Sequence, residues 1–442
     1  MLVNAMVHKL SIKTAIALCL SAIIGDTLFV VTAVPIAQSG PNSLVAYVVV
    51  GILMLVVALQ LAELGSIMPG EKGVTYSYIK RAYGTELGFI TGILLFISYC
   101  AVISAITFSF GGYFLGLIGI DSVNLQILIS TVLIIFISLI NMRGVKETSS
   151  LSKVLVAITV LTAVAFFAYA VYHGGKAGLL STDFTGSPAQ GALGAFGEAI
   201  TTIVFAYAGF QTITTFTKEI KGQGKGLAKV LIYSILISMV AYLIVAVGLM
   251  ALVPSAKSII SPQPLLYALQ YAGAPEYVLV IIGIGALIAI SAATIAILNT
   301  VSRLVYQIGV DGLLPKLARG YNRSKDVAVN GIWISAIVSI LMLFSGDLYQ
   351  MISISNFGVI FSWMMACISV ISLRRRGTAG TFRSPLYPYL PMIGMGACVV
   401  FLLGLPRTSL VIGVVLIQIL IVTYYGLIEL RYKDVPKVRI FD

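Results

Sequence analysis

Long runs of apolar residues, separated by short polar segments, recur along the whole chain. Most of these runs have about twenty residues, the length that an α-helix needs to cross the hydrocarbon core of a bilayer. The stretch 230–253, for example, contains no charged residue. Because lipid offers the backbone no hydrogen-bond partners, each run is predicted to be a membrane-spanning helix. We predict twelve spans, at about residues 12–38, 43–68, 87–117, 124–141, 151–172, 196–217, 228–253, 276–308, 327–345, 349–373, 387–405 and 408–430.

The composition supports a membrane protein and argues against a water-soluble one. Of the 442 residues, 59% are hydrophobic and only 10% are charged, and the mean hydropathy is +1.04. A soluble domain of this size needs roughly a quarter of its residues charged to cover its surface. The segments between the predicted spans are too short to form a separate domain. The sequence therefore predicts an all-α polytopic membrane protein in which residues 1–442 form a single transmembrane domain.

The net charge of +12 is distributed unevenly between the two ends of the predicted helices. With twelve spans, all but three of the 28 Lys and Arg residues fall on the side of the N-terminus, and the exceptions are Lys176, Lys257 and Arg407. Positive residues are retained in the cytoplasm. The charge therefore reflects membrane orientation rather than binding of nucleic acid. It predicts a multi-pass protein of the cell membrane with both termini in the cytoplasm.

Cysteine and histidine give no sign of a metal site or a cofactor. Cys19, Cys100, Cys367 and Cys398 lie within predicted spans without paired spacing, so they are interpreted as packing residues. The two histidines lie outside the spans, far apart in the sequence. With no nucleophile or metal cluster in view, we predict that the protein is not an enzyme and holds no metal and no cofactor.

Two predicted spans contain an interruption at corresponding positions. The first span runs through Gly25, and the sixth runs through Gly209 within the sequence Ala-Tyr-Ala-Gly-Phe. Matched interruptions in two halves of a chain point to an inverted repeat, with a substrate site at the broken helices near the middle of the bilayer. Gly209 is then expected to line that site through its backbone. The alternative is that both glycines only let helices pack closely.

Four motifs follow one another along the chain. They are Ile24-Gly25-Asp26-Thr27-Leu28-Phe29; Ala62-Glu63-Leu64 with Pro69, Gly73, Tyr76 and Tyr78; Phe205-Ala206-Tyr207-Ala208-Gly209-Phe210; and Ser302-Arg303-Leu304 with Asp311 to Lys316. In this order and spacing they resemble the amino acid–polyamine–organocation (APC) superfamily permeases, over roughly residues 10–375. The resemblance implies a LeuT-like five-plus-five inverted repeat, with repeats at about 10–172 and 190–375 and two peripheral helices at about 385–431. It also implies secondary transport by alternating access.

The resemblance implies which residues bind the substrate. In a broken helix the free amides of the second half form an anion site. The amides of Gly25, Asp26 and Thr27 match those that hold the substrate carboxylate in the family. In the family, carbonyls of helix 6 hold the substrate amine, and the matching residues are Phe205, Ala206, Tyr207 and Ala208. Helix 3 lines the substrate pocket in the family, and the matching residue is Tyr99. For Tyr99, helix packing is the alternative interpretation.

The chain also departs from the family pattern. Asp26 replaces a serine, Thr27 replaces a glycine, and Gln211 replaces a glutamate that is common after the helix 6 break. A lysine that some members carry in helix 5 aligns with Thr159, so coupling through that lysine cannot be carried over. Thr159 and Ser291 are candidate ligands of a sodium ion between helices 5 and 8, although such hydroxyls often bond carbonyls of their own helix.

Asp26 is a carboxylic acid within a predicted span, where ionisable groups are costly and usually functional. Three interpretations stay open. Asp26 caps the second half of helix 1, or it carries the coupling proton, or it is the counter-ion of a cationic substrate. An amino acid substrate fits best when Asp26 is protonated, because two carboxylates repel, and an amine without a carboxylate fits best when Asp26 is ionised.

Charged residues near the cytoplasmic ends of the spans suggest a second site. Glu63 and Glu219 are expected to pair with basic groups such as Arg303 or Lys218, and Glu63, Glu219 and Arg303 together are candidates for a cytoplasmic gate. The Arg374-Arg375-Arg376 run is expected to anchor the protein to lipid headgroups.

These observations predict a proton-coupled permease for amino acids or related amines, embedded in the lipid bilayer. One alternative is a permease for organic cations or polyamines, with Asp26 as the amine ligand. A more distant alternative is a potassium uptake protein of the same fold. The partner is in each case a small molecule or ion, and the oligomeric state stays open.

Overall fold

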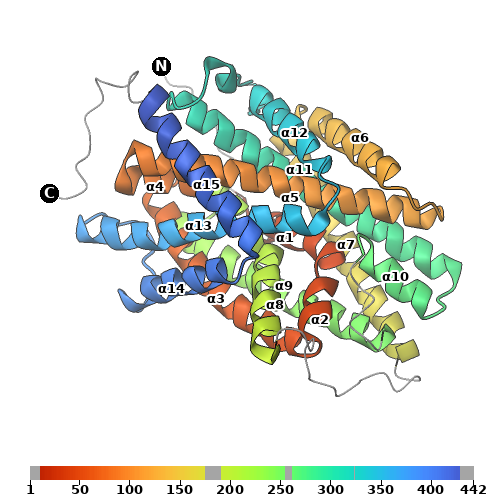
Figure 1. Cartoon of the computed structure of the whole chain (residues 1–442). Coiled ribbons are helices and arrows are strands. Elements are labelled where there is room, and N and C mark those ends of the chain that lie inside the picture. Colours follow the sequence, from red (N-terminus) through yellow and green to blue (C-terminus); the bar gives the residue numbers. More distant parts are fainter. Residues whose placement is uncertain (1–9, 175–190, 254–260, 323, 429–442) are drawn as a thin grey trace.

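The computed structural model describes residues 10–174, 191–253, 261–322 and 324–428. It does not describe the side chains of Asp26 and of residues 145–153, 191–193 and 427–428. Within the described part, the chain is built from helices, and its only β pairing is two isolated bridges. Figure 1 shows long helices lying side by side, with shorter helices at their ends.

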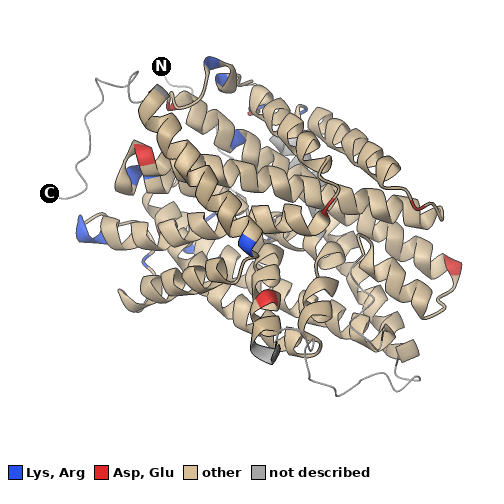
Figure 2. Cartoon of the chain, viewed as in Figure 1, with Lys and Arg blue, Asp and Glu red and all other residues tan. Residues whose placement is uncertain are grey.

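Among the described residues, ten helices are long and apolar enough to cross a membrane. The protein is therefore a multi-pass membrane protein, and its helices carry large apolar side chains such as Leu128, Phe136 and Val422 on their outer surface. Figure 2 shows Lys and Arg mostly near helix ends. The ten are α1 (Ile12–Val30), α3 (Asn42–Ile67), α5 (Thr85–Leu117), α6 (Val123–Asn141), α7 (Val145–Gly174), α8 (Gly191–Tyr207) with the 3₁₀-helix η1 (Ala208–Phe216), α9 (Gln223–Leu252), α11 (Glu276–Val310), α13 (Leu348–Arg375) and α15 (Arg407–Thr423), which a π-helical turn η4 (Tyr424–Ile428) extends.

The other two predicted spans are shorter than expected. They correspond to α12 (Val329–Leu343) and α14 (Tyr389–Leu403), each of 15 residues. At a rise of about 1.5 Å per residue, such a helix is shorter than the roughly 30 Å hydrocarbon core. The structure therefore supports ten spans, and the count of twelve stays a prediction. The remaining helices are short connectors: α2 (Ala33–Ser39), α4 (Thr75–Tyr83), α10 (Pro264–Tyr271) and η3 (Lys316–Arg319).

Helix α1 lies at the centre of the bundle. It packs against α7, α9 and α11 and crosses α8 and η1 (Figure 1). Helix α5 packs along α11 on one side and α13 on the other, and α3 packs along α9. This arrangement surrounds the α1–η1 crossing with other helices, so any site there is shielded from lipid.

The predicted break in helix 1 is not at Gly25. Helix α1 stays α-helical through residues 24–27 and ends at Val30; the interruption lies at Val31–Thr32, before α2. The Thr27 hydroxyl donates to the Ile23 carbonyl at 2.5 Å, a bond within the helix. A Cβ at Gly25 would lie 2.9 Å from the Ala289 carbonyl oxygen of α11. Gly25 therefore serves close helix packing, which was the alternative interpretation.

The predicted interruption of helix 6 is present. The α-helix α8 ends at Tyr207, and the chain continues from Ala208 to Phe216 as a 3₁₀-helix. A run of nine residues in this tighter form is unusual, since 3₁₀ segments seldom exceed three or four residues and a longer one often marks a functional site. The change in helix type falls within the motif that the sequence singled out.

Candidate functional site

The crossing of α1 and η1 is unusually close at Gly209. A Cβ built on Gly209 would lie 1.7 Å from the carbonyl oxygen of Ala22 and 2.9 Å from the amide nitrogen of Ile23. Only glycine fits there, because the backbone of α1 occupies the place of a side chain. The crossing brings the end of α8 against the middle of α1, and it positions the contacts that follow.

Four oxygen atoms converge beside this crossing, and we call them the oxygen cluster. They are the hydroxyls of Thr27 and Tyr242 and the carbonyl oxygens of Ile23 and Ala206. The Tyr242 hydroxyl lies 2.9 Å from the Ile23 oxygen, 2.5 Å from the Ala206 oxygen and 2.6 Å from the Thr27 hydroxyl. The Thr27 hydroxyl lies 3.2 Å from the Ala206 oxygen. The cluster therefore joins α1, α8 and α9 where helix 6 is interrupted.

The oxygen cluster contains two of the predicted substrate residues, Ala206 through its carbonyl, as the resemblance implied, and Thr27 through its hydroxyl rather than its amide. The amides of Gly25, Asp26 and Thr27 lie inside α1 rather than at the start of a helix, so in this conformation they do not form the expected open anion site. Thr27 acts instead through its side chain. Tyr242 was not predicted, because a single tyrosine in an apolar span carries no sequence signal of its own.

Aromatic rings surround the oxygen cluster. The ring of Tyr242 stacks on that of Tyr47 at 5.6 Å and meets the edge of Tyr207 at 5.3 Å. Tyr207 and Phe205 are buried, and the Tyr207 hydroxyl has no hydrogen-bond partner among the described residues. Of the predicted helix 6 residues, the carbonyl of Ala206 is thus the one that the structure places in the oxygen cluster.

A second polar group lies next to η1. The Gln211 side-chain oxygen accepts a hydrogen bond of 2.9 Å from the Trp363 indole of α13, and Phe210 stacks on the same indole at 5.1 Å. Tyr99 of α5 lies beside Gln211. Within the described part of the chain, the Gln211 side-chain nitrogen and the Tyr99 hydroxyl are buried and have no hydrogen-bond partner beyond the contact between these two side chains. Tyr99 therefore adjoins the helix 6 interruption, and its place in the substrate pocket stays a prediction.

The structure describes the hydroxyls of the candidate coupling residues Thr159 and Ser291 but not the side chain of Asp26. The backbone of Asp26 lies in α1 between Gly25 and Thr27, and its side chain lies outside the described residues. The Thr159 hydroxyl donates to the Leu155 carbonyl at 2.9 Å, and that of Ser291 donates to the Leu287 carbonyl at 2.8 Å. Both hydroxyls thus bond their own helices, which is the alternative to a sodium site.

Glu63 has a different partner from the one expected. Arg374 of α13 makes a bidentate ion pair with Glu63, with Nε 2.5 Å from Oε1 and Nη2 2.7 Å from Oε2. The backbone amide and the hydroxyl of Ser384 also donate to Glu63 Oε2, at 2.8 and 2.7 Å. Glu63 is 1% exposed. Arg374 is therefore occupied by a buried ion pair and is not the predicted lipid anchor, whereas Arg375 and Arg376 are exposed.

Arg303 and Glu219 belong to a separate group of charged residues. Asp326 bridges two cations, with Oδ2 3.1 Å from Arg303 Nη2 and Oδ1 2.9 Å from Lys72 Nζ. Tyr321 donates to the same carboxylate. The Arg303 guanidinium is 1% exposed and lies over the Phe216 ring at 4.9 Å.

The pKa of Glu219 and that of Asp326, two acids near Arg303, are shifted in opposite directions. Burial raises the pKa of Glu219, although Arg303 partly opposes this effect. Burial also acts to raise the pKa of Asp326, but the Tyr321 hydrogen bond together with Lys72 and Arg303 lowers it below its ordinary value. Asp326 therefore stays ionised as the partner of Arg303. The three gate candidates do not form one network, because Glu63 pairs elsewhere.

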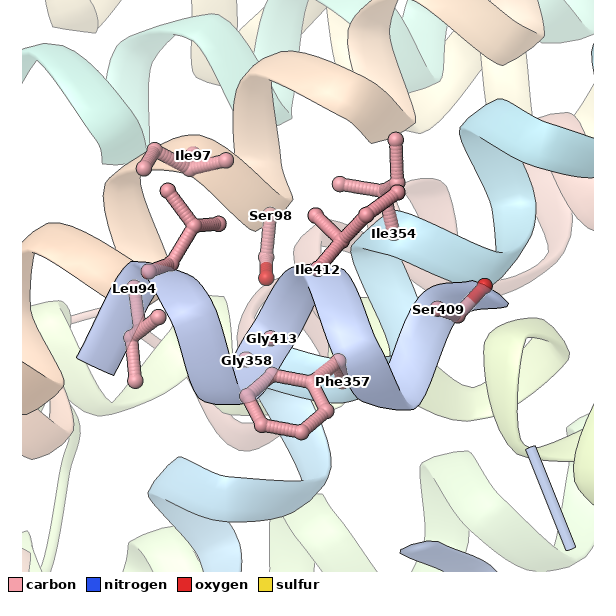
Figure 3. A pocket seen from close by; sticks show the side chains of 10 residues that line it. Leu94, Ile97, Ser98, Ile354, Phe357, Gly358, Ser409, Ile412 and Gly413 are labelled. Atoms are coloured by element: carbon pink, nitrogen blue, oxygen red, sulfur yellow. The ribbon is translucent and has the colours of Figure 1, made fainter. Parts of the chain in front are cut away.

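A pocket lies away from these groups, between α5, α13 and α15 (Figure 3). Its lining is mostly apolar, with Leu94, Ile97, Phe357 and Ile412 around the hydroxyls of Ser98 and Ser409. It contains neither the oxygen cluster nor a charged side chain. We therefore place the candidate site at the α1–η1 crossing and not in this pocket.

Comparison with known proteins decides the family. Residues 10–426 match the amino acid permease family. The chain belongs to the amino acid permeases. It is thus a transporter and not an enzyme, in agreement with its long apolar helices.

Curated relatives cover nearly the whole chain. The methylthioribose transporter of Bacillus subtilis is 27% identical, with 96% of this chain and 94% of the relative covered. The branched-chain amino acid permease BcaP of Lactococcus lactis is 28% identical, with 89% and 88% covered. The serine/threonine exchanger SteT of Bacillus subtilis is 24% identical, with 91% of each covered. These relatives differ in the cargo that their names state.

Proposed function

We propose that this permease carries amino acids by proton-coupled alternating access, with its substrate held between α1, α8 and η1. The observation that carries the proposal is the oxygen cluster at the interruption of helix 6. It supplies carbonyl and hydroxyl acceptors for an ammonium group in a place shielded from lipid. The names of BcaP and SteT, both amino acid carriers, support this substrate class.

The position of the oxygen cluster also defines where the other parts of the substrate lie. The amine lies at the helix 6 carbonyls, among Phe205 to Ala208, and the side chain of the substrate extends toward Tyr99 and Gln211. These two buried polar side chains find only each other and Trp363 as side-chain partners among the described residues, so they favour a polar contact there, because buried donors and acceptors are stable only when they are hydrogen-bonded. The carboxylate lies beside residues 25–27 once α1 opens at that point. Both termini are cytoplasmic, as the charge distribution predicts, and residues 10–172 and 190–375 form the two repeats.

Alternating access requires one side of the site to close while the other opens. On the cytoplasmic side, the group of Arg303, Asp326, Lys72 and Glu219 joins α11 to the segments that follow α3 and η1. We assign the cytoplasmic gate to this group. Glu63 takes no part in it, because its bond to Arg374 ties α3 to α13 instead.

Uptake by the purified protein tests the proposed function. In proteoliposomes, labelled leucine or serine should enter with saturation and at least tenfold faster than in protein-free vesicles. Methylthioribose, which has neither an amine nor a carboxylate, and putrescine, an amine without a carboxylate, are the alternative substrates. Saturable uptake of either compound in place of every amino acid would contradict an amino acid permease.

Asp26→Asn tests proton coupling. If Asp26 carries the proton, the variant should lose accumulation driven by an imposed pH gradient yet keep substrate exchange, because asparagine resembles the protonated acid. If Asp26 is an amine counter-ion, binding itself should weaken by about 2–5 kcal/mol. If it is a helix cap, neither property should change much. Accumulation by Asp26→Asn that still follows the pH gradient would end the proton-carrier hypothesis.

A further inference from the structure

The oxygen cluster contains more close contacts than its hydrogen atoms can serve. Five oxygen–oxygen separations of 3.2 Å or less join the four atoms. The two hydroxyls contribute one hydrogen each, and the two carbonyls contribute none. A set of acceptors that outnumbers its donors is suited to a group that is positively charged and has several hydrogens to donate. An ammonium group has three.

The cluster as it stands has no room for such a group. Separations of 2.5 to 3.2 Å are direct hydrogen-bond lengths, so nothing can enter between these atoms. The carbonyls of Ile23 and Ala206 belong to the backbones of α1 and α8, and Thr27 bonds its own helix. The Tyr242 hydroxyl comes instead from α9, at the end of a ring that packs on Tyr47 and Tyr207. It is therefore the atom that is able to withdraw.

We propose that the Tyr242 hydroxyl occupies the ammonium subsite of the empty transporter and that the substrate ammonium displaces it. Tyr242 then binds α9 to α1 and α8 when no substrate is present, and the substrate takes over the same two carbonyls when it arrives. Thr27 keeps its place and contacts the ammonium. This inference rests on the proposed function, because it takes the oxygen cluster as the amine end of the substrate site.

Displacement predicts that removing the Tyr242 hydroxyl strengthens substrate binding, whereas a hydroxyl that contacts the substrate directly would weaken binding when removed. A tyrosine that competes with the ammonium weakens substrate binding, so Tyr242→Phe should bind the amino acid more tightly, on the order of three- to tenfold, the effect of one hydrogen bond. The same variant should be less stable without substrate, since two carbonyls lose a donor. Thr27→Val should act in the opposite direction and weaken binding, because that hydroxyl stays as a ligand.

The test measures substrate-dependent thermal stabilisation of the purified full-length protein, with leucine and serine as probes. Tyr47→Phe is the matched control, since its hydroxyl is 3.5 Å from the Thr32 carbonyl and outside the cluster. We expect unchanged affinity in the control, tighter binding in Tyr242→Phe and weaker binding in Thr27→Val. Unchanged or weaker binding by Tyr242→Phe, with the wild type and control still binding, would overturn the displacement proposal alone.

Two further outcomes complete the test. If neither the wild type nor Tyr47→Phe is stabilised by either amino acid, the proposed function fails and the displacement fails with it. If Tyr242→Phe does not yield monodisperse protein, 3-fluorotyrosine placed at position 242 serves instead. Its fluorine resonance should shift on addition of the amino acid, and a resonance that stays in place while the protein binds would overturn the proposal.

Discussion

Gly209→Ala is expected to abolish uptake by removing the folded transporter rather than by blocking a cavity. The added Cβ would lie 1.7 Å from the Ala22 carbonyl oxygen, and backbone cannot move aside as a flexible side chain does. Overpacking a core by a methyl group typically costs about 1–3 kcal/mol, and a contact this short lies at the upper end of that range or beyond. Size-exclusion chromatography and thermal unfolding in detergent should show aggregated or strongly destabilised protein.

Gly197→Ala is the matched control for this prediction. Gly197 lies on α8, the helix that η1 continues, and a Cβ there meets no atom within 4 Å. This variant should fold and transport like the wild type, apart from a small gain in helix propensity. A Gly209→Ala protein that is as stable and as active as Gly197→Ala would show that α1 and η1 do not cross as closely as the structure places them.

Arg374→Ala is expected to destabilise the protein by about 3–5 kcal/mol, the usual effect of removing one partner from a buried ion pair. Glu63 is 1% exposed, and it would keep two hydrogen bonds from Ser384 but lose the one cation that pairs with it among the described residues. The double variant Glu63→Ala, Arg374→Ala should lose less than Arg374→Ala alone, because no uncompensated charge remains. Thermal unfolding of the two proteins in detergent provides the comparison.

The neighbouring Arg375→Ala provides the control, since Arg375 is exposed on the same helix. Its stability should stay within about 0.5 kcal/mol of the wild type, as for most surface substitutions. If Arg374→Ala and Arg375→Ala unfold at the same temperature, both arginines serve only at the membrane surface. The sequence interpretation of the arginine run would then hold for all three residues.

Several features could be predicted from the sequence because they depend on local properties. The length and polarity of a run decide whether it can cross a bilayer, so nine of the ten spans were predicted within about five residues of their observed ends, whereas the first, predicted at 12–38, ends at Val30. The family followed from short motifs at the expected spacing. The change of helix type at Tyr207–Ala208 lies inside one of these motifs, because glycine and small residues there weaken the regular α-helix.

The tertiary structure decided which residues meet. Gly25 looked like a break, but its missing side chain is used for contact with α11, and the interruption lies at Val31–Thr32. The partner of Glu63 is Arg374, which lies 311 positions away in the chain. Tyr242 reaches Thr27 across 215 positions. No local pattern encodes such pairings, since each depends on how whole helices cross, and for that reason the oxygen cluster is visible only in three dimensions.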